Sequence, residues 1–316
     1  MRFTSLIQLS PAEFDIHFPA PCCTEARTRL GRLTELLQAD PVPDLRRPEM
    51  AALLPQVDIL VTGWKSHPVD AELRQRMPRL KLIAHLAGTV KGVLTQGVAS
   101  SGLRVVSAAE ANAKPVAEFT LAHILLHLKR VADWRSLYRE KRSRIDTRNT
   151  RFGGPLGNAG RTVGIIGASR IGRRVAEDLR RHGVSVLLHD PFVSAETAAS
   201  FGAQKVEMAA LLRRSDVVSL HQPLLPTTER SFGAAEFARM RDGALLINTA
   251  RGRIIDSDAL EAAMSGGRLF AVLDVTDPEP LPDTSPLWDM PNVTITPHIA
   301  GSFGCEVCAM TELVLD

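Results

Sequence analysis

The sequence is short of cysteine, of excess charge and of long hydrophobic runs. Its 316 residues include four Cys, too few for a disulfide framework in a chain of this length. The net charge of +3 gives no reason to expect a nucleic acid or an anionic membrane as a partner. The nearest candidate for a membrane span, residues 119–128, is too short and contains His123 and His127. Because Pro11 and Glu13 interrupt the start, no signal peptide is expected, and a cytoplasmic protein is predicted.

The composition that remains is that of an ordinary globular protein. Hydrophobic residues make up 45% of the chain and charged residues 23%, which excludes a disordered, collagen-like or coiled-coil protein. At roughly 150 residues per domain, the length predicts about two domains.

The first part of the chain, 1–112, alternates short apolar segments with segments of helical spacing. Such alternation is typical of a parallel sheet covered by helices on both faces, so a small α/β domain is predicted. Strands are expected near 6–9, 58–62, 80–86 and 103–107, and helices near 25–38 and 70–77.

A second α/β unit begins at Arg161 and shows a doubly wound pattern. Its strands are expected at 162–166, 184–188, 217–220, 244–248, 269–275 and 293–296. Between the two units, residues 116–128 have helical spacing and 135–151 are rich in Arg and Lys. This basic run favours a solvated connector or a subunit-contact arm, with a nucleic-acid patch as the alternative.

A glycine-bounded turn follows the first strand of the second unit. Gly167 and Gly172 occupy the outer positions of a G-x-G-x-x-G fingerprint, and Ser169 replaces the middle glycine. The helix that starts here offers free N–H groups to a phosphate, and Arg170 adds a charge. Asp190 ends the next strand, where a carboxylate accepts hydrogen bonds from ribose hydroxyls and repels a 2′-phosphate. The pattern predicts a dinucleotide site that takes NAD rather than NADP.

Three polar residues follow later strands of the same unit: Arg251, Glu279 and His298. A forked guanidinium can hold a carboxylate and polarise a carbonyl, and a histidine can donate or accept a proton near neutral pH. A carboxylate beside the histidine selects its tautomer. Each residue alone also suits a structural role. Because all three follow strands of the unit that carries the nucleotide turn, the set together favours hydride transfer to a keto acid.

Several segments resemble the D-isomer-specific 2-hydroxyacid dehydrogenase family. They include LKLIAHLAGTV, TVGIIGASRIGRRVAEDL, GALLINTARGRIIDSDALEAA, VLDVTDPEPLP and PNVTITPHIAG, in this order along the chain. The resemblance implies two doubly wound α/β domains. A Rossmann NAD-binding domain over 113–300 would be inserted into a smaller, flavodoxin-like substrate domain formed by 1–112 and completed by 301–316. Family members usually end in a longer returning helix than the residues after Gly301 would allow.

The resemblance also assigns site residues. It implies that Arg251 binds the substrate carboxylate and carbonyl, that Glu279 tunes the histidine, and that His298 is the acid/base. The turn Ala87-Gly88-Thr89 would bind the substrate carboxylate through N–H groups. The expected NAD-site residues are Gly167, Ser169, Arg170, Ile171, Gly172, Asp190, His221, Pro223, Thr249, Ala250, Asp274, Ala300 and Gly301.

The hypothesis is an NAD-dependent oxidoreductase that interconverts a 2-keto acid and a D-2-hydroxy acid, and that forms a homodimer through the 135–151 region. An NAD(H)-responsive, corepressor-like binding protein of the same fold and a paralogue that binds no nucleotide are the alternatives. No metal site is expected. The adjacent Cys22 and Cys23 suit one tetrahedral site poorly, and Cys305 and Cys308 are interpreted as packing residues on one helix face, without redox use.

Overall fold

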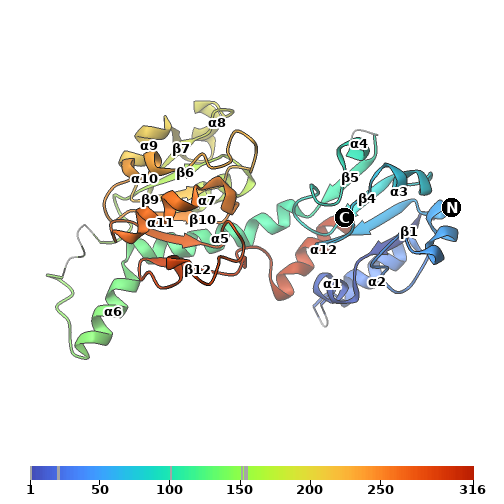
Figure 1. Cartoon of the computed structure of the whole chain (residues 1–316), viewed down its shortest axis with the longest axis horizontal. Coiled ribbons are helices and arrows are strands. Elements are labelled where there is room, and N and C mark those ends of the chain that lie inside the picture. The colour runs from blue at the N-terminus through green and yellow to red at the C-terminus, as the bar shows by residue number, and fades with distance from the viewer. Residues whose placement is uncertain (1, 20–21, 100–101, 151, 153–155) are drawn as a thin grey trace. The chain divides into compact units, whose positions relative to one another are not determined.

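The computed structural model describes residues 2–19, 22–99, 102–150, 152 and 156–316 (Figure 1). Its contacts divide the chain into two compact units. The first comprises Met1–Ala113 together with Gly301–Asp316, and the second comprises Lys114–Ala300. None of the helices among the described residues combines the length and apolarity that a membrane crossing requires.

The first unit contains a five-stranded parallel sheet in the order β2-β1-β3-β4-β5. Its strands are β1 (Thr4–Gln8), β2 (Glu35–Leu36), β3 (Ile59–Thr62), β4 (Leu82–His85) and β5 (Arg104–Ser107). Its helices are α1 (Pro11–His17), α2 (Thr24–Leu33), α3 (Ala71–Arg76), α4 (Gln96–Ala99) and α12 (Val307–Leu315), together with the start of α5 (Ala109–Leu128). Leu6, Leu60 and Ile83 on one face of this sheet and Ile7, Val61 and Ala84 on the other are buried in two separate clusters, so both faces contribute to the core.

The last residues of the chain belong to the first unit. In Figure 1, α12 (red) lies beside α1 and α2 (blue), and it also contacts β4. Met310 and Thr311 are fully buried, and the Thr311 hydroxyl donates a hydrogen bond of 2.8 Å to the carbonyl oxygen of His17. The residues after Gly301 therefore form a helix that completes this core, although the sequence suggested a shortened tail.

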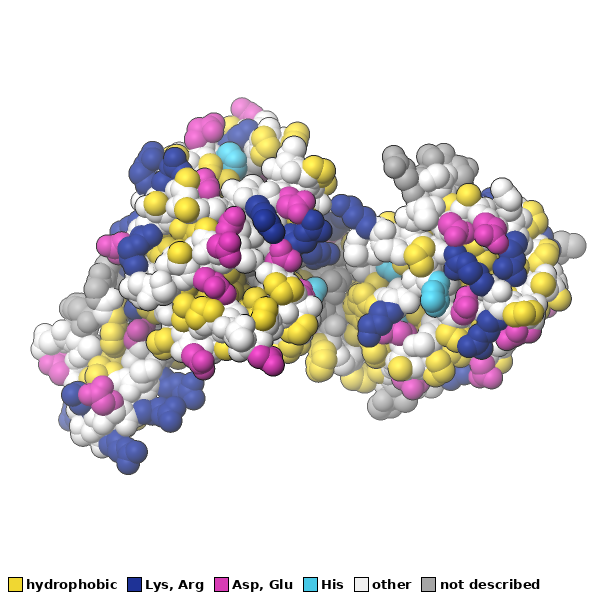
Figure 2. Space-filling view, viewed as in Figure 1, with side chains coloured by type: hydrophobic (Ala, Val, Ile, Leu, Met, Phe, Trp, Pro, Cys, Tyr) yellow, Lys and Arg dark blue, Asp and Glu magenta, His cyan; other side chains and the backbone are white. Residues whose placement is uncertain are grey.

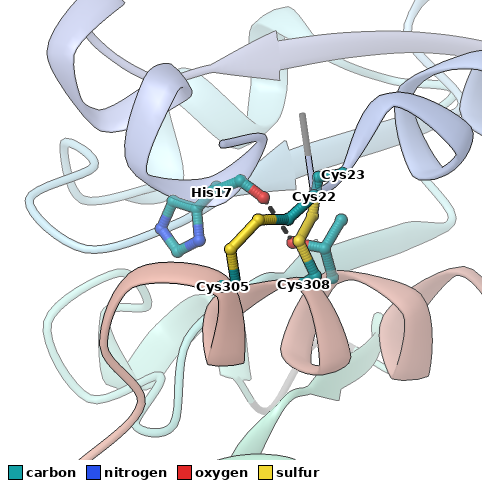
Figure 3. Close-up of a disulfide and its surroundings, with 6 residues drawn as sticks. His17, Cys22, Cys23, Cys305 and Cys308 are labelled. Atoms are coloured by element: carbon teal, nitrogen blue, oxygen red, sulfur yellow. Dashed lines mark hydrogen bonds between the residues drawn. A yellow bond between two sulfur atoms is a disulfide. The ribbon is translucent and has the colours of Figure 1, made fainter. Parts of the chain in front are cut away.

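The cysteines are paired, and the expectation of unpaired packing cysteines was wrong. Cys22 is bonded to Cys305 and Cys23 to Cys308, with Cα–Cα distances of 5.7 and 5.4 Å. The pairs are 283 and 285 residues apart in sequence. They meet because α12 folds onto the start of α2, an arrangement that no local sequence spacing reveals (Figure 3).

The second unit contains a seven-stranded parallel sheet in the order β12-β11-β10-β9-β6-β7-β8. Its strands are β6 (Thr162–Ile166), β7 (Ser185–His189), β8 (Ala203–Lys205), β9 (Val217–Leu220), β10 (Leu245–Asn248), β11 (Phe270–Leu273) and β12 (Val293–Ile295). Besides most of α5, its helices are α6 (Val131–Lys141), α7 (Arg170–Leu179), α8 (Ala195–Ser200), α9 (Met208–Arg214), α10 (Ala234–Arg239) and α11 (Ser257–Ser265). Two separate clusters of buried apolar side chains pack against this sheet. The strand order reverses between β6 and β9, which confirms the doubly wound fold.

Side-chain oxygens cap several of the helices. Ser10, Asp70, Ser169 and Asp256 accept hydrogen bonds from N–H groups in the first turns of α1, α3, α7 and α11, respectively. Such caps satisfy donors that a helix leaves unpaired and so define where each helix begins.

The basic segment after α5 is partly helical. Within the second unit, α6 extends away from the sheet, and none of its residues is buried (Figure 1). Trp134 contacts the ring of Phe152 edge-on, with centroids 4.8 Å apart, and the exposed fraction of Tyr138 is 62%. Figure 2 shows Lys and Arg side chains gathered over this helix at the lower left of the view.

Candidate active site

Several candidate residues follow the carboxyl ends of the parallel strands in the seven-stranded sheet. Gly167 follows β6, Asp190 follows β7, and His221 follows β9. Asp274 follows β11 directly, while Arg251 and His298 are each separated by two residues from the ends of β10 and β12. Open parallel sheets bind ligands in this position, next to the point where the strand order reverses.

The glycines of the turn after β6 cannot carry a side chain. Gly167 has φ +95°, and a Cβ there would lie 2.5 Å from the backbone nitrogen of Gln222. A Cβ on Gly172 would overlap the carbonyl oxygen of Gly167. The turn is therefore tight, and α7 begins directly against it, as a phosphate-binding helix start requires.

Ser169 fits the middle position of the turn without strain. Its backbone is extended, with φ −65° and ψ 176°, so this position does not need the conformational freedom of glycine. The Ser169 hydroxyl oxygen accepts a hydrogen bond of 3.2 Å from the backbone N–H of Gly172 and caps α7. The hydroxyl keeps its own proton for donation. The structure therefore gives this residue a capping role that the sequence pattern alone did not show.

Asp190 ties the second strand of the unit to the glycine turn. One carboxylate oxygen accepts a hydrogen bond of 2.8 Å from the N–H of Ala168, and the other accepts one of 2.8 Å from the N–H of Phe192. Each oxygen retains a lone pair for a further donor. Phe192, with an exposed fraction of 91%, and Pro191 supply no cation beside this carboxylate.

His221 is buried and packs against Gly172 of the glycine turn. It is 4% exposed, its Nε2 hydrogen-bonds the hydroxyl of Ser219 at 2.9 Å, and its Cβ lies 3.2 Å from the position of a Cβ on Gly172. Burial lowers the pKa of His221 to about 3, so the ring is neutral at physiological pH. Nearby Pro223 is exposed, and its carbonyl oxygen accepts from the Thr228 hydroxyl.

Arg251 is presented at the end of β10 by Asn248. The buried Asn248 side chain accepts from the N–H of Ala250 at 3.0 Å and donates to the carbonyl of Arg251 at 2.9 Å. A Cβ on Gly252 would overlap the carbonyl oxygen of Thr276, so this backbone passes directly against the segment after β11. The Arg251 side chain is exposed. Thr249 is 8% exposed, and its hydroxyl oxygen lies 3.4 Å from the hydroxyl oxygen of Thr120.

Glu279 and His298 form a hydrogen-bonded pair. Nδ1 of His298 lies 2.7 Å from Oε1 of Glu279, and their side chains are 50% and 44% exposed. Because a carboxylate only accepts hydrogen bonds, Nδ1 carries the proton in this arrangement. The opposite ring nitrogen, Nε2, is then the position for proton exchange with another group. Glu279 lies between two cis X-Pro peptide bonds, at Pro278 and Pro280.

Asp274 anchors the turn that carries His298. Its buried carboxylate accepts hydrogen bonds from the Thr296 hydroxyl at 2.6 Å and from the N–H groups of Ile299 and Ala300 at 2.8 and 2.9 Å. His298 itself has φ +58°, a left-handed conformation that is uncommon for residues with a side chain. The three bonds to Asp274 hold the neighbouring backbone in place around it.

In the first unit, the turn Ala87-Gly88-Thr89 follows β4. Ala87 is buried and Thr89 is exposed. His85, at the end of β4, lies beneath this turn, and its Nδ1 hydrogen-bonds the Thr62 hydroxyl at 2.9 Å. Burial lowers the pKa of His85 to about 4, an effect that the Thr89 backbone opposes. Asn112 lies close to Gly88 and accepts a hydrogen bond of 2.8 Å from the N–H of Ser302, next to Gly301.

Comparison with known proteins identifies the family. Residues 121–300 match the model of the NAD binding domain of D-isomer specific 2-hydroxyacid dehydrogenases. The D-3-phosphoglycerate dehydrogenase of Mycobacterium bovis is 32% identical over 260 residues, which are 81% of this chain and 47% of that protein. The hydroxypyruvate reductase of Thermotoga maritima is 30% identical over 294 residues, which are 92% of each protein. The chain belongs to the D-isomer specific 2-hydroxyacid dehydrogenase family.

The share of the relative's own length that this chain covers differs between these relatives. The chain spans about half the length of the phosphoglycerate dehydrogenases that it matches, with 47% of the Mycobacterium bovis protein covered. A solved structure described as a D-lactate dehydrogenase from Aquifex aeolicus complexed with NAD and lactic acid superposes with a TM-score of 0.73 at 26% identity. That match covers 98% of this chain and 93% of the other, so it includes both units of the fold.

The cofactor of this family member is NAD, as the sequence predicted. The residues of the second unit fit it. The turn at Gly167 and Gly172 has no room for side chains, the start of α7 can receive a phosphate, and the Asp190 carboxylate has free lone pairs for ribose hydroxyls. Of the other predicted residues, Arg170 is exposed at the start of α7, Ile171 is half-buried behind it, and Ala250 and Ala300 lie in the strand-end segments.

Sequence reasoning missed three residues that position the candidate groups. Asn248 presents Arg251, His85 lies under the 87–89 turn, and Asn112 holds the backbone at Ser302. A polar residue at the last position of an otherwise apolar strand is the signal that could have identified Asn248 and His85. Asn112 lies within a helix and has no comparable signal.

Proposed function

We propose that this dehydrogenase reduces a 2-keto acid to the D-2-hydroxy acid and catalyses the reverse oxidation. The observation that carries the proposal is the hydrogen-bonded pair of Glu279 and His298 at strand ends of an NAD-binding domain. Bound NADH supplies the hydride. Relatives are named glyoxylate reductase, hydroxypyruvate reductase and D-3-phosphoglycerate dehydrogenase, which supports a small 2-keto acid as substrate.

His298 is the proposed acid/base. In the reduction, protonated His298 donates the proton on Nε2 to the substrate carbonyl oxygen, and in the oxidation neutral His298 accepts it back. The Nδ1–H of His298 donates a hydrogen bond to Glu279, which holds the ring in one orientation and stabilises the imidazolium. Asp274 holds the backbone that follows His298 through the N–H groups of Ile299 and Ala300.

Arg251 is the proposed substrate-binding cation. Its guanidinium can donate two parallel hydrogen bonds to a carboxylate or share its donors with the carbonyl oxygen. In this structure Nη1 donates to the carbonyl of Ala250, and the rest of the group is exposed. We assign the turn Ala87-Gly88-Thr89 of the first unit to the substrate carboxylate, through its backbone N–H groups.

The test is to mix the protein with NADH and a panel of 2-keto acids, from glyoxylate and hydroxypyruvate to phenylpyruvate, and to follow NADH loss. We expect His298→Ala to abolish turnover while NADH titration shows nearly unchanged binding. Wild-type protein that binds NADH and turns over no 2-keto acid would instead support a corepressor-like binding protein. Absence of NADH binding would support a paralogue without a nucleotide site.

We also propose that the protein is a homodimer and that α6 contributes to the contact. The support is that α6 has no buried residue, although it carries the exposed apolar side chains of Val131 and Tyr138. Light scattering should give twice the chain mass of 34.4 kDa. Replacing Tyr138 with Glu should shift the mass toward the monomer, and a monomeric wild-type protein would contradict the proposal.

A further inference from the structure

Two disulfides join the same two short segments of the first unit. Cys22 and Cys23 immediately precede α2, and Cys305 and Cys308 lie just before and within the first turn of α12. Figure 3 shows the two bridges side by side between these segments, with His17 close to them. The proposed dehydrogenase chemistry uses none of these residues, so the bridges need another explanation.

The two bridges differ in their exposure to solvent. Cys23 is 1% exposed and Cys308 is 8% exposed, whereas Cys22 and Cys305 are both exposed. A thiol in solution can therefore reach the sulfurs of the Cys22–Cys305 bridge. It reaches the other bridge only after the surrounding structure has opened, because a thiolate must approach a disulfide sulfur directly to attack it.

The inner bridge belongs to an apolar core that also holds α12 without covalent bonds. Cys23 and Cys308 pack in one cluster with Phe14 and Leu30. The exposed carboxylate of Asp316 at the end of the chain forms an ion pair of 2.5 Å with Arg29, and Thr311 donates to the backbone at His17. The outer bridge is thus not required to keep α12 on the first unit, and it can open without removing the helix.

We propose that Cys22–Cys305 is a thiol–disulfide exchange site for low-molecular-weight thiols such as glutathione. A glutathione thiolate attacks one sulfur of the bridge, forms a mixed disulfide, and releases the other cysteine as a thiolate. A second glutathione attacks the mixed disulfide, so that two glutathione molecules are oxidised to their disulfide while both cysteines become thiols. The two electrons come from glutathione, and its two thiol protons balance the two cysteine thiols.

The outer bridge restrains the segment that leaves the candidate active site. Six residues, 299–304, separate His298 from Cys305 in the chain. In the described structure, Ser302 is held by the side chain of Asn112 and Phe303 by that of Glu306. Opening of the Cys22–Cys305 bridge removes the covalent restraint at the end of this segment, and the backbone amides of 301–306 then open more often.

The first experiment measures thiols in the full-length protein without any mutation. Protein purified without reductant is incubated in a series of reduced and oxidised glutathione mixtures, alkylated with N-ethylmaleimide while folded, and analysed by intact mass and peptide mapping. We expect two labels per chain, at Cys22 and Cys305, to appear as the reduced fraction rises, while Cys23 and Cys308 stay unlabelled until the protein is unfolded with reductant.

Three results would overturn the proposal. One is four free thiols even in oxidised glutathione, and another is labelling of the inner pair before the outer pair. The third is protein that contains stoichiometric zinc and no disulfide, which would make the four cysteines a metal site instead. None of these measurements depends on catalytic turnover, so they remain informative if the proposed dehydrogenase activity is absent.

The second experiment follows amide hydrogen exchange at 301–306 with and without reduced glutathione. Reduction should speed exchange there in the wild type. The paired variant Cys22→Ala/Cys305→Ala should exchange at the faster rate in both conditions, and the matched variant Cys23→Ala/Cys308→Ala should keep the response. An identical rate in reduced and oxidised wild-type protein would show that the bridge does not restrain the segment and would refute that part of the proposal.

Discussion

Oε1 of Glu279 lies 2.7 Å from Nδ1 of His298, and the two residues come from different strand connections, after β11 and β12. The pair joins two loops across the end of the sheet. It also orients the histidine so that Nε2, on the far side of the ring, is directed away from the carboxylate.

Replacing Glu279 with Gln should show whether Glu279 acts by orienting the His298 ring or by its negative charge. The amide oxygen can still accept the bond from Nδ1, but it no longer stabilises the imidazolium. We therefore expect kcat for keto-acid reduction to fall by about 100-fold, at the lower end of acid–base contributions. The NADH dissociation constant should not change. Glu177→Gln, at an exposed position on α7, is the control and should retain wild-type kcat; equal kcat in both variants would contradict the role of Glu279.

Gly252→Ala tests the close approach of the segments after β10 and β11. A Cβ at this position would overlap the Thr276 carbonyl, so the backbone that presents Arg251 must shift. We expect urea denaturation to show a loss of roughly 1–3 kcal/mol, as for other overpacked sites. Gly266→Ala is the matched control, because nothing lies within 4 Å of its Cβ position and its φ is −76°. Similar stability of the two variants would contradict the contact.

Either disulfide alone should provide most of the stability that the two provide together. Either bridge alone closes a loop of more than 280 residues, whereas the second then closes only a ring of a few residues. On the loop-entropy scale, removing one pair should cost about 2 kcal/mol and removing both about 8 kcal/mol.

Urea denaturation of the two paired alanine variants and of the quadruple variant measures this difference. Cys22→Ala/Cys305→Ala gives the cleaner single-pair value, because these residues are exposed and their truncation leaves no buried cavity. Strictly additive losses would show that loop closure is not the source of the stabilisation.

Buried histidines should make stability depend on pH. Burial lowers the pKa of His17, His85 and His127 to about 4 and that of His221 to about 3, against an ordinary value of 6.5. Between about pH 6.5 and pH 4 the unfolded chain binds protons that the folded chain does not, so stability falls as the pH is lowered through this window.

The measurement is the urea midpoint at several pH values from 7 to 4.5. His127→Asn should flatten the dependence because it removes one of these neutral groups, whereas His67→Asn, at an exposed position, should leave it unchanged. A midpoint that rises on acidification through this window would contradict the assignment.

Much of the fold could be predicted because apolar strands end at polar or glycine residues. The expected strands at 162–166 and 217–220 coincide with β6 and β9. The helix expected at 25–38 ends earlier, at Leu33, because the chain then turns to pair β2 with the edge of β1. The short β8 was not predicted, since three residues carry too little pattern to be recognised.

The residues of the candidate site could be predicted from the sequence, but most of the hydrogen bonds that position them could not. Glu279 and His298 were expected to interact, and the structure places them in hydrogen-bond contact. The three donors to Asp274 are contributed by a segment more than 20 residues away in sequence, and they become visible only when β11 and β12 are paired. The same reason explains the cysteine pairs, because their proximity depends on α12 returning to α2.

The paired cysteines also change what a protease would release from this molecule. Arg142 and Arg144, after α6, are exposed and lie between the bridged positions. A single cut there leaves two fragments that remain joined through Cys22–Cys305 and Cys23–Cys308, so denaturing electrophoresis without reductant shows no separate fragments. Only reduction of both bridges would allow the two fragments to separate, so the oxidised protein would stay in one piece after a cut at this exposed segment.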